Sequence, residues 1–398
     1  MEDQLWIYNA YDVFASYSTG IKFDYICIYV FLAIITLYYA KKLSNSNNTS
    51  WRRDAIIYSL IFSVIEGVRY LRGTDYLNYA LYYKYGIYGY DVEFVYNIIQ
   101  SLFHLINLPF WCLLIFYSFC WIWGLLILAR HEGCKHIKYI LPIAIVFALQ
   151  GFECFVRQSF AFSFVFIFIL YLLKKKYLKA SLFALISLFI HSGSIVFIII
   201  ILGVYMLKNQ LINSKIYTCV YLLSTFIYKA QLLTVVNAVL LIFPFLDDSL
   251  IGGYMANADR WFGDDAFREA YTRGLLSKIM IACFDVSIMV LSYSAIRKVP
   301  RSTSNSNITF YYNLFCITNI MLQLFYNYEL LKRCFMTFYM FGAFLIVFIL
   351  QYPPKNKYEL LIRKYLILFT IIYYIKIILL SGNQLFVWDA LGKYNFNL

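Results

Sequence analysis

Charged residues are scarce in this chain: Asp, Glu, Lys and Arg make up 14% of its 398 residues, whereas a typical soluble domain has about 25%. Apolar residues make up 62% of the sequence, and the mean hydropathy is +0.68. This balance argues against a series of soluble domains and indicates a membrane protein. We predict an all-α, polytopic integral membrane protein that forms a single domain over residues 1–398.

Paired cysteines and the common catalytic motifs are also missing. The nine cysteines stand singly, most of them within apolar runs, which favours small buried side chains over a disulfide framework or a metal site. The sequence contains no P-loop, GxSxG, HExxH or GxGxxG pattern, which argues against a nucleotide-driven pump. We therefore expect no metal and no other cofactor.

Acidic residues are few beside basic ones, 21 against 34, and the net charge is +13. The basic residues are spread over many short loops instead of forming one patch. Membrane topology explains such a distribution better than nucleic-acid binding does. We therefore expect the lipid bilayer, and no nucleic acid, as a partner.

A membrane-spanning helix needs about 20 mainly apolar residues. About twelve stretches qualify, near 25–43, 54–71, 108–129, 139–155, 157–173, 177–192, 193–208, 215–231, 274–296, 308–328, 333–351 and 364–381. The boundaries within 139–208 stay open, because these stretches are short and follow one another closely. Two long polar and aromatic insertions, at about 72–107 and 232–273, interrupt the series.

The basic residues predict the orientation of these helices. If the helices alternate, 20 of the 34 basic residues fall in short loops on one side, which should be the cytoplasmic side. Both termini and both long insertions then lie outside. Seven of the 14 remaining basic residues are arginines, and acidic residues gather on the same side. Because the arginine fork binds phosphate or carboxylate through two hydrogen bonds, this outer face is the expected site.

The stretch EGVRYLRGTDYLNY (66–79) follows an apolar run and combines arginines, acids and a glycine. Arg69 and Arg72 are three residues apart, so they share a helix face if the helix continues, and Glu66 is spaced to pair with Arg69. Gly73 can end the helix before Asp75. The alternative is that both arginines only anchor the helix at the membrane interface.

The stretch GFECFVRQSFAFSF (151–164) places Arg157 and Gln158 at the expected start of a helix. A helix N-terminus favours an anion, so this position suits phosphate binding. Glu153 precedes Arg157 by four residues, and an exposed pair between the two is the alternative.

Two later stretches hold further candidates. FIHSGSIVF (189–197) places His191 at the expected outer end of a helix, where it could act as a general base or simply bond to a neighbouring carbonyl. YNYELLKRCFMTFY (326–339) sets Lys332 and Arg333 between two apolar helices, as site residues or as part of a charged turn. The insertion 232–273 adds Arg260 and Arg273, whose setting suits either sugar contact or an ordinary surface loop.

These segments, in this order, resemble the EpsG/Wzy group of bacterial polysaccharide polymerases. The family pattern is roughly R-Y-x-x-G-x-D-Y-x-x-Y, then R-Q, H-x-S and a late arginine, over about 65 to 350 here. The matching positions are Arg69, Tyr70, Gly73, Thr74, Asp75, Tyr76, Tyr79, Arg157, Gln158, His191, Ser192 or Ser194, and Arg333.

The resemblance implies a GT-C-like membrane glycosyltransferase in the bacterial inner (cytoplasmic) membrane, with its active site facing the periplasm or outside. It would polymerise undecaprenyl-pyrophosphate-linked oligosaccharide repeat units into O-antigen, capsule or exopolysaccharide, without metal or nucleotide. A chain-length regulator is one candidate partner.

The residues of this chain fit that chemistry. His191 or Asp75 would activate the acceptor hydroxyl, with Arg157 as a third catalytic residue. The pyrophosphate and the sugars would be held by Arg69, Arg72, Tyr76, Gln158, Arg333, Arg260 and Arg273.

Two other functions remain open at this point. An O-antigen ligase would act on the same lipid-linked glycan but would need lipid A as the acceptor. A flippase or transporter would need a cationic cavity open alternately to both sides, whereas the arginines of this chain are expected on one side.

Overall fold

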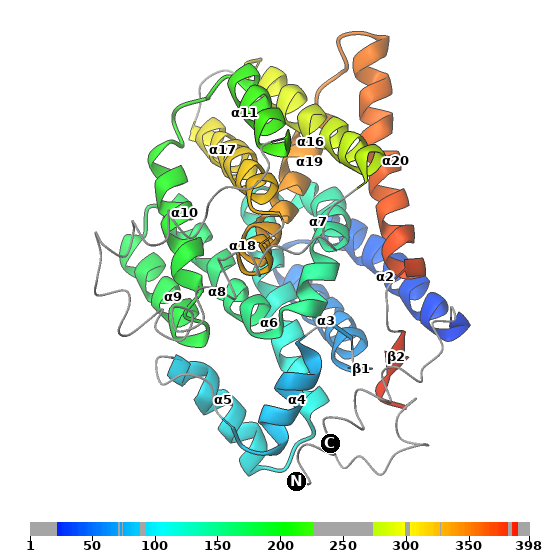
Figure 1. The fold of residues 1–398 in the computed structure, drawn as a ribbon, viewed down its shortest axis with the longest axis vertical. Helices are drawn as coiled ribbons and strands as arrows, with labels where there is room; N and C mark the ends of the chain where they lie inside the picture. The colour runs from blue at the N-terminus through cyan, green and yellow to red at the C-terminus, as the bar shows by residue number, and fades with distance from the viewer. Residues whose placement is uncertain are drawn as a thin grey trace.

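The computed structural model describes residues 22–70, 72–73, 75–87, 93–226, 274–298, 303–326, 328–380 and 384–388. In this part of the chain nearly all regular structure is helical (Figure 1). The first half contains α2 (Phe23–Asn45), α3 (Asn48–Gly67), β1 (Arg69–Tyr70), α4 (Tyr76–Lys84), α5 (Phe94–Leu105), α6 (Phe110–His131), α7 (Cys134–Cys154), α8 (Val156–Leu173), α9 (Tyr177–Ile190), α10 (Ser194–Met206) and α11 (Ser214–Phe226). The second half contains α16 (Leu275–Ile296), α17 (Thr303–Leu324), α18 (Glu329–Met336), η4 (Thr337–Phe341), α19 (Gly342–Leu350), α20 (Lys357–Leu380) and β2 (Leu385–Phe386).

The predicted helical, multi-pass membrane architecture is confirmed, with six segments among the described residues that are long and apolar enough to cross a membrane. These are Phe23–Asn45, Phe110–His131, Cys134–Cys154, Val156–Leu173, Leu275–Ile296 and Leu331–Leu350. Helices α3, α17 and α20 are equally long but carry more polar or charged residues. Two further apolar helices, α9 and α10, are shorter. Twelve spans and a GT-C-like fold stay predictions.

The two predicted insertions differ in what the structure describes. The first, 72–107, contains helices α4 and α5, which lie at the bottom of Figure 1. The second, 232–273, lies outside the described residues, and so do Arg260 and Arg273.

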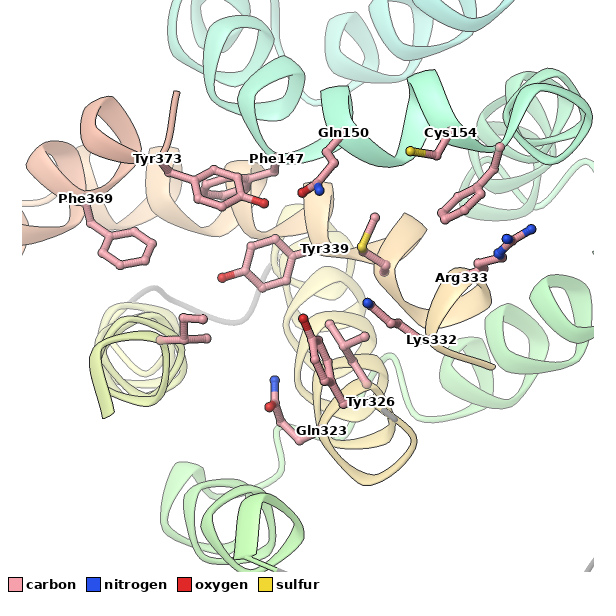
Figure 2. Close-up of a pocket in the computed structure, with 14 residues that line it drawn as sticks. Phe147, Gln150, Cys154, Gln323, Tyr326, Lys332, Arg333, Tyr339, Phe369 and Tyr373 are labelled. Atoms are coloured by element: carbon pink, nitrogen blue, oxygen red, sulfur yellow. The ribbon is translucent and has the colours of Figure 1, made fainter. Parts of the chain in front are cut away.

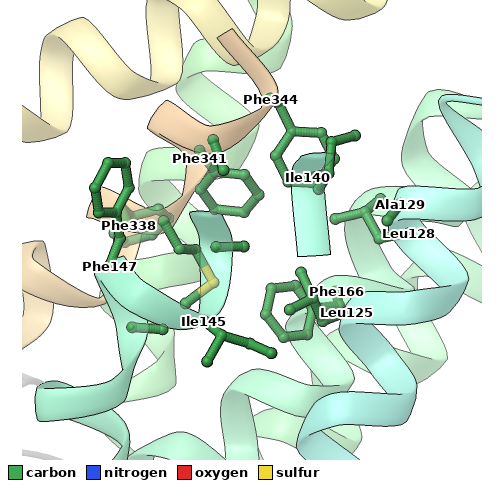
Figure 3. Packing of buried hydrophobic residues seen from close by; sticks show 14 of the residues in the cluster. Leu125, Leu128, Ala129, Ile140, Ile145, Phe147, Phe166, Phe338, Phe341 and Phe344 are labelled. Carbon is green, nitrogen blue, oxygen red and sulfur yellow. The ribbon is translucent and has the colours of Figure 1, made fainter. Parts of the chain in front are cut away.

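An aromatic core joins the two halves of the chain (Figure 3). Phe338 and Phe341 of η4 are buried against Phe162 and Phe166 of α8, with ring centroids 5.5 Å apart for Phe162 and Phe338 and 6.4 Å apart for Phe166 and Phe341. A Cβ atom on Gly124 of α6 would lie 2.6 Å from a carbonyl oxygen of α8. Small residues of this kind allow helices to pack closely in membranes. This packing holds the start of α8 beside α18 and η4.

The segment after α3 is tied to the segment after α20. Strands β1 and β2 pair antiparallel, with Arg69 opposite Phe386 and Tyr70 opposite Leu385. The backbone amide of Val387 also donates to the carbonyl of Val68, at 2.9 Å. The first motif therefore continues from α3 as a short strand, so Arg69 and Arg72 do not share a helix face as the sequence had suggested.

Candidate active site

Helix α8 begins where the backbone breaks at Phe155. This residue has φ −112° and ψ 70°, which separates α7 from α8 and turns the first residues of α8 into a new direction. The four-residue spacing of Glu153 and Arg157 therefore does not bring them together on one helix. The alternative of an exposed Glu153–Arg157 pair is wrong, because Glu153 pairs with Arg72 and Arg157 pairs with Glu93.

A buried carboxylate, Glu93, connects Arg157 and His191. Its side chain is 1% exposed, and Arg157 Nη1 lies 2.5 Å from one of its oxygens. The other oxygen lies 3.2 Å from His191 Nδ1 and also accepts from the backbone amide and the hydroxyl of Ser192, at 2.9 and 3.2 Å. Arg157 Nε donates to the Tyr79 hydroxyl at 3.2 Å. Three segments far apart in the sequence thus meet at one carboxylate.

The charge of Glu93 determines which nitrogen of His191 carries the proton in the neutral ring. Burial alone would raise the pKa of Glu93, but the hydrogen bond from His191 and the charge of Arg157 outweigh it and hold that pKa below its usual value. An ionised carboxylate only accepts hydrogen bonds, so His191 Nδ1 donates, and in the neutral ring Nε2 keeps its lone pair. A Cβ atom at Gly193 would lie 2.8 Å from this Nε2. Glycine therefore keeps the space beside the nitrogen open.

A second ion pair lies beside this network. Arg333 Nη1 contacts both carboxylate oxygens of Asp75, at 3.2 and 2.9 Å, and both side chains are 21% exposed. The Gln158 amide donates to the Arg333 carbonyl at 2.9 Å and to the Thr337 hydroxyl at 2.7 Å. The adjacent residues Arg157 and Gln158 therefore connect the Glu93 carboxylate to the helix that carries Arg333.

Arg333 of this ion pair also lines a cavity of about 240 Å³ (Figure 2). Its walls come from α7, α16, α17, α18, η4 and α20, and are rich in aromatic side chains. Lys332 and Arg333 line one end, and the amides of Gln150 and Gln323 line the walls, while no carboxylate does so in the described part of the chain. Such a cavity suits an anion at one end and a sugar or apolar group along the walls.

The cavity wall also includes Tyr339, which rests on a buried acid that the sequence analysis overlooked. Asp285 lies within α16 and is fully buried. It accepts hydrogen bonds from the hydroxyls of Tyr339 and Tyr221, both at 2.7 Å. Because ionisable side chains inside membrane segments are rare and costly, we read Asp285 as the group that fixes the Tyr339 ring in the wall.

Arg69 and Arg72 lie apart from the cavity, inside the protein. Arg69 pairs with Glu66 at 3.7 Å, as the spacing predicted. Arg72 pairs with Glu153 at 3.2 Å and donates to the Tyr29 hydroxyl. The Tyr29 hydroxyl in turn donates to Glu153 at 2.6 Å, and its oxygen also lies 3.1 Å from a carboxylate oxygen of Glu66. The two arginines, 1% and 2% exposed, thus belong to one buried charge cluster.

Aromatic rings cover the same cluster. Arg69 lies 5.3 Å from the ring centre of Phe152, and Arg72 lies 5.1 Å from Tyr25 and 4.7 Å from Phe386. Neither arginine lines the cavity. Their predicted contact with phosphate stays a prediction, and the geometry assigns them a structural role in this state of the protein.

Tyr76 and Gly73 are likewise held by packing. Tyr76 is buried between the rings of Tyr70 and Phe110, with centroids 5.9 and 5.4 Å away. In this geometry its side chain does not face a sugar, and the predicted sugar contact stays a prediction. Gly73 has φ +89°, and a Cβ there would lie 2.3 Å from the Glu153 carbonyl oxygen. The turn predicted at Gly73 is present, and it packs directly on the end of α7.

Asp75, Arg157, Gln158, His191 and Arg333 are the predicted residues that the fold brings to one region. Sequence reasoning missed Glu93, which it had counted only among the outer acids, and it gave Tyr79 no role beyond the motif. The signal for Glu93 was its place just before the amphipathic helix α5, which packs on α9 and so approaches His191.

Apolar helices enclosing a cluster of paired arginines and carboxylates define this chain as a helical membrane protein with a charged internal site. The EpsG family model matches residues 55–396, and the chain belongs to this family. The matched range spans Asp75, Glu93, Arg157, His191 and Arg333. No curated protein and no solved structure matches the chain.

Proposed function

We propose that this chain is a membrane glycosyltransferase that polymerises undecaprenyl-pyrophosphate-linked oligosaccharide repeat units on the outer face of the bacterial inner membrane. Membership of the EpsG family supports a membrane polysaccharide polymerase. The observation that carries the reaction is that Glu93 binds His191 and Arg157, while Gln158, next to Arg157, bonds to Arg333 of the cavity. The product would be O-antigen, capsule or exopolysaccharide.

In the proposed reaction, a hydroxyl of the acceptor sugar attacks the anomeric carbon of the donor glycan. The bond between that carbon and the pyrophosphate oxygen breaks, and the donor lipid leaves as undecaprenyl pyrophosphate. His191 Nε2 takes the proton of the hydroxyl, since Nδ1 is committed to Glu93. Arg333, which lines the cavity, neutralises the charge that develops on the leaving pyrophosphate.

The same geometry favours His191 over Asp75 as the base. Both oxygens of Asp75 contact the Arg333 guanidinium, and a paired arginine favours the ionised, weakly basic form of a carboxylate. Asp75 then orients Arg333 toward the cavity. Arg157 holds Glu93 in place and keeps its charge balanced.

The decisive experiment uses purified protein and lipid-linked single repeats without lipid A. A ladder of longer products is expected, and single repeats that stay single would refute the polymerase. Products that appear only after lipid A is added would identify a ligase. Transport of the lipid-linked unit without any ladder would identify a flippase.

His191→Ala should abolish the ladder. The matched control is His131→Ala, because His131 Nδ1 contacts Glu132 at 2.9 Å and its side chain is 18% exposed, against 15% for His191. A full ladder from the His191 variant would exclude this residue as the base. The Arg157→Ala variant should also form no ladder. The Arg69→Ala variant should form none either, because it disrupts the buried charge cluster around Glu66.

A further inference from the structure

A second cavity, of about 510 Å³, lies between α2, α7, α19 and α20. We call it the lateral groove. Its walls are almost entirely apolar and include Leu32, Leu37, Pro142, Ile143, Ile346 and Ile371. Leu37 and Ile371 are more than half exposed, so the groove opens on the surface of the helical body that faces lipid in a membrane protein.

Three of the hydroxyl groups along the lateral groove, those of Thr36, Thr370 and Tyr374, are already hydrogen-bonded. The Thr36 hydroxyl shares a hydrogen bond with Tyr58 at 2.9 Å. The Thr370 hydroxyl donates to a carbonyl of its own helix at 2.8 Å, and the Tyr374 hydroxyl donates to the Tyr29 carbonyl at 2.8 Å. The groove therefore offers a hydrocarbon surface along its length, which suits an acyl chain and not a polar solute.

Two lysines line the same groove: Lys41 from the last turns of α2 and Lys138 from the first turns of α7. Both are exposed. The neighbouring Lys42 is bound to Asp54 at 3.1 Å, whereas the structure shows no carboxylate paired with Lys41 or Lys138 across the residues it describes. Two such cations at an apolar groove complement a phosphate that carries a hydrocarbon chain.

We propose that the lateral groove binds an anionic phospholipid, with an acyl chain along the apolar walls and the phosphate between Lys41 and Lys138. Basic pockets between membrane helices favour anionic head groups by electrostatic attraction. A zwitterionic lipid fills the groove equally well but gains little from the lysines. A free phosphate ion gains nothing from the walls.

The groove shares a helix with the site cavity, which gives the lipid a consequence for catalysis. Phe369 and Tyr373 of α20 line the site cavity, across it from Arg333 (Figure 2), while the adjacent Thr370 and Tyr374 line the groove. A lipid in the groove therefore fixes the position of α20 and with it one wall of the cavity. This second step rests on the proposed function, whereas lipid binding itself does not.

The binding test uses full-length protein in micelles with equal amounts of phosphatidylglycerol and phosphatidylcholine of identical acyl chains, measured by native mass spectrometry. We expect phosphatidylglycerol to be retained about 30-fold more strongly, since each lysine near an anionic lipid contributes roughly 1 kcal/mol. Lys41→Gln with Lys138→Gln should remove this preference. The control, Lys175→Gln with Lys176→Gln, removes two exposed lysines of the loop between α8 and α9 and should keep it.

Substitutions in the walls test the acyl chain separately. Ala33→Phe fills the groove and should lower the retention of both lipids, while Ile34→Phe, on the exposed side of the same helix, should not. Equal retention of the two lipids, an undiminished preference in the Lys41 and Lys138 double variant, or equal effects of the two phenylalanines would overturn the proposal. Displacement of phosphatidylglycerol by undecaprenyl phosphate at equal concentration would also overturn it and assign the groove to the substrate lipid.

The activity test compares the ladder in bilayers with and without phosphatidylglycerol. We expect a several-fold faster ladder with the anionic lipid, and no such gain in the Lys41 and Lys138 double variant. An equal rate in both bilayers refutes the coupling through α20 while leaving lipid binding to its own test. A missing ladder under every condition refutes the proposed function instead.

Discussion

Replacing Glu93 by Gln removes the charge that Arg157 and His191 share while keeping the size of the side chain. Glu93 is 1% exposed and accepts from Arg157, His191 and twice from Ser192. Removing one partner of a buried ion pair costs about 3–5 kcal/mol, because the other charge stays buried without compensation. Since Arg157 remains 16% exposed, we expect the low end, about 3 kcal/mol.

This loss corresponds to about a 100-fold fall in the folded-to-unfolded ratio. It is measured by titrating the purified protein with SDS in mixed micelles while following tryptophan fluorescence. The matched control is Glu132→Gln, which removes a carboxylate bound to a histidine but 17% exposed, and which should cost less than about 1 kcal/mol. The rate at which the Glu93 variant forms the ladder should fall by at least the same factor as its folded-to-unfolded ratio. The reason is that His191 also loses the group that fixes its ring.

The pH dependence provides an independent check. The folded-state pKa of Glu93 is held below its ordinary value of 4.5. Its contribution to stability is therefore complete above about pH 4.5 and disappears as the pH falls through the lowered folded pKa. The Gln variant should lack this step in acid. Wild-type stability with full ladder formation in the variant would refute the view that Glu93 organises the site.

Three further outcomes are expected. Gly193→Ala should slow the ladder at least tenfold with unchanged thermal unfolding, because the new methyl group would lie beside His191 Nε2; an unchanged rate would argue against Nε2 as the reacting atom. Gly73→Ala should lower the yield of folded protein, since both φ +89° and the Glu153 carbonyl oppose a side chain; normal yield and stability would contradict this. Arg157→Lys should form little of the ladder, because one ammonium group cannot bond both Glu93 and Tyr79 as the arginine fork does. A full ladder from this variant would show that the fork geometry of Arg157 is not required.

The helical membrane class follows from composition and apolar run length, since these properties are local. The meeting of Arg157, His191 and Arg333 was predicted only by resemblance to a family, and the structure places them in one region. What the sequence could not show is which carboxylate each arginine takes. That choice depends on the break at Phe155, which sends Glu153 toward Arg72 and Arg157 toward Glu93. A four-residue spacing is informative only while the helix continues through it.

The burial of Arg69 and Arg72 likewise depends on contacts that only the folded chain makes. Spacing correctly predicted the Glu66–Arg69 pair, because three residues at the end of α3 suffice to bring them together. The aromatic cover over Arg72 comes from Phe386, in a strand after α20. No local sequence pattern predicts a contact between residues so far apart in the chain. The sequence alone therefore predicted that the two arginines are interfacial anchors or bind the ligand.

The pairing of β1 with β2 also determines when, during synthesis, the burial of Arg72 can be completed. The first motif leaves the ribosome early, yet Arg72 cannot contact Phe386 until the chain has been synthesised through α20 to β2. A nascent chain that stops before β2 therefore lacks the Phe386 ring over the Arg72 guanidinium. Formation of the strand pair completes the burial of this arginine.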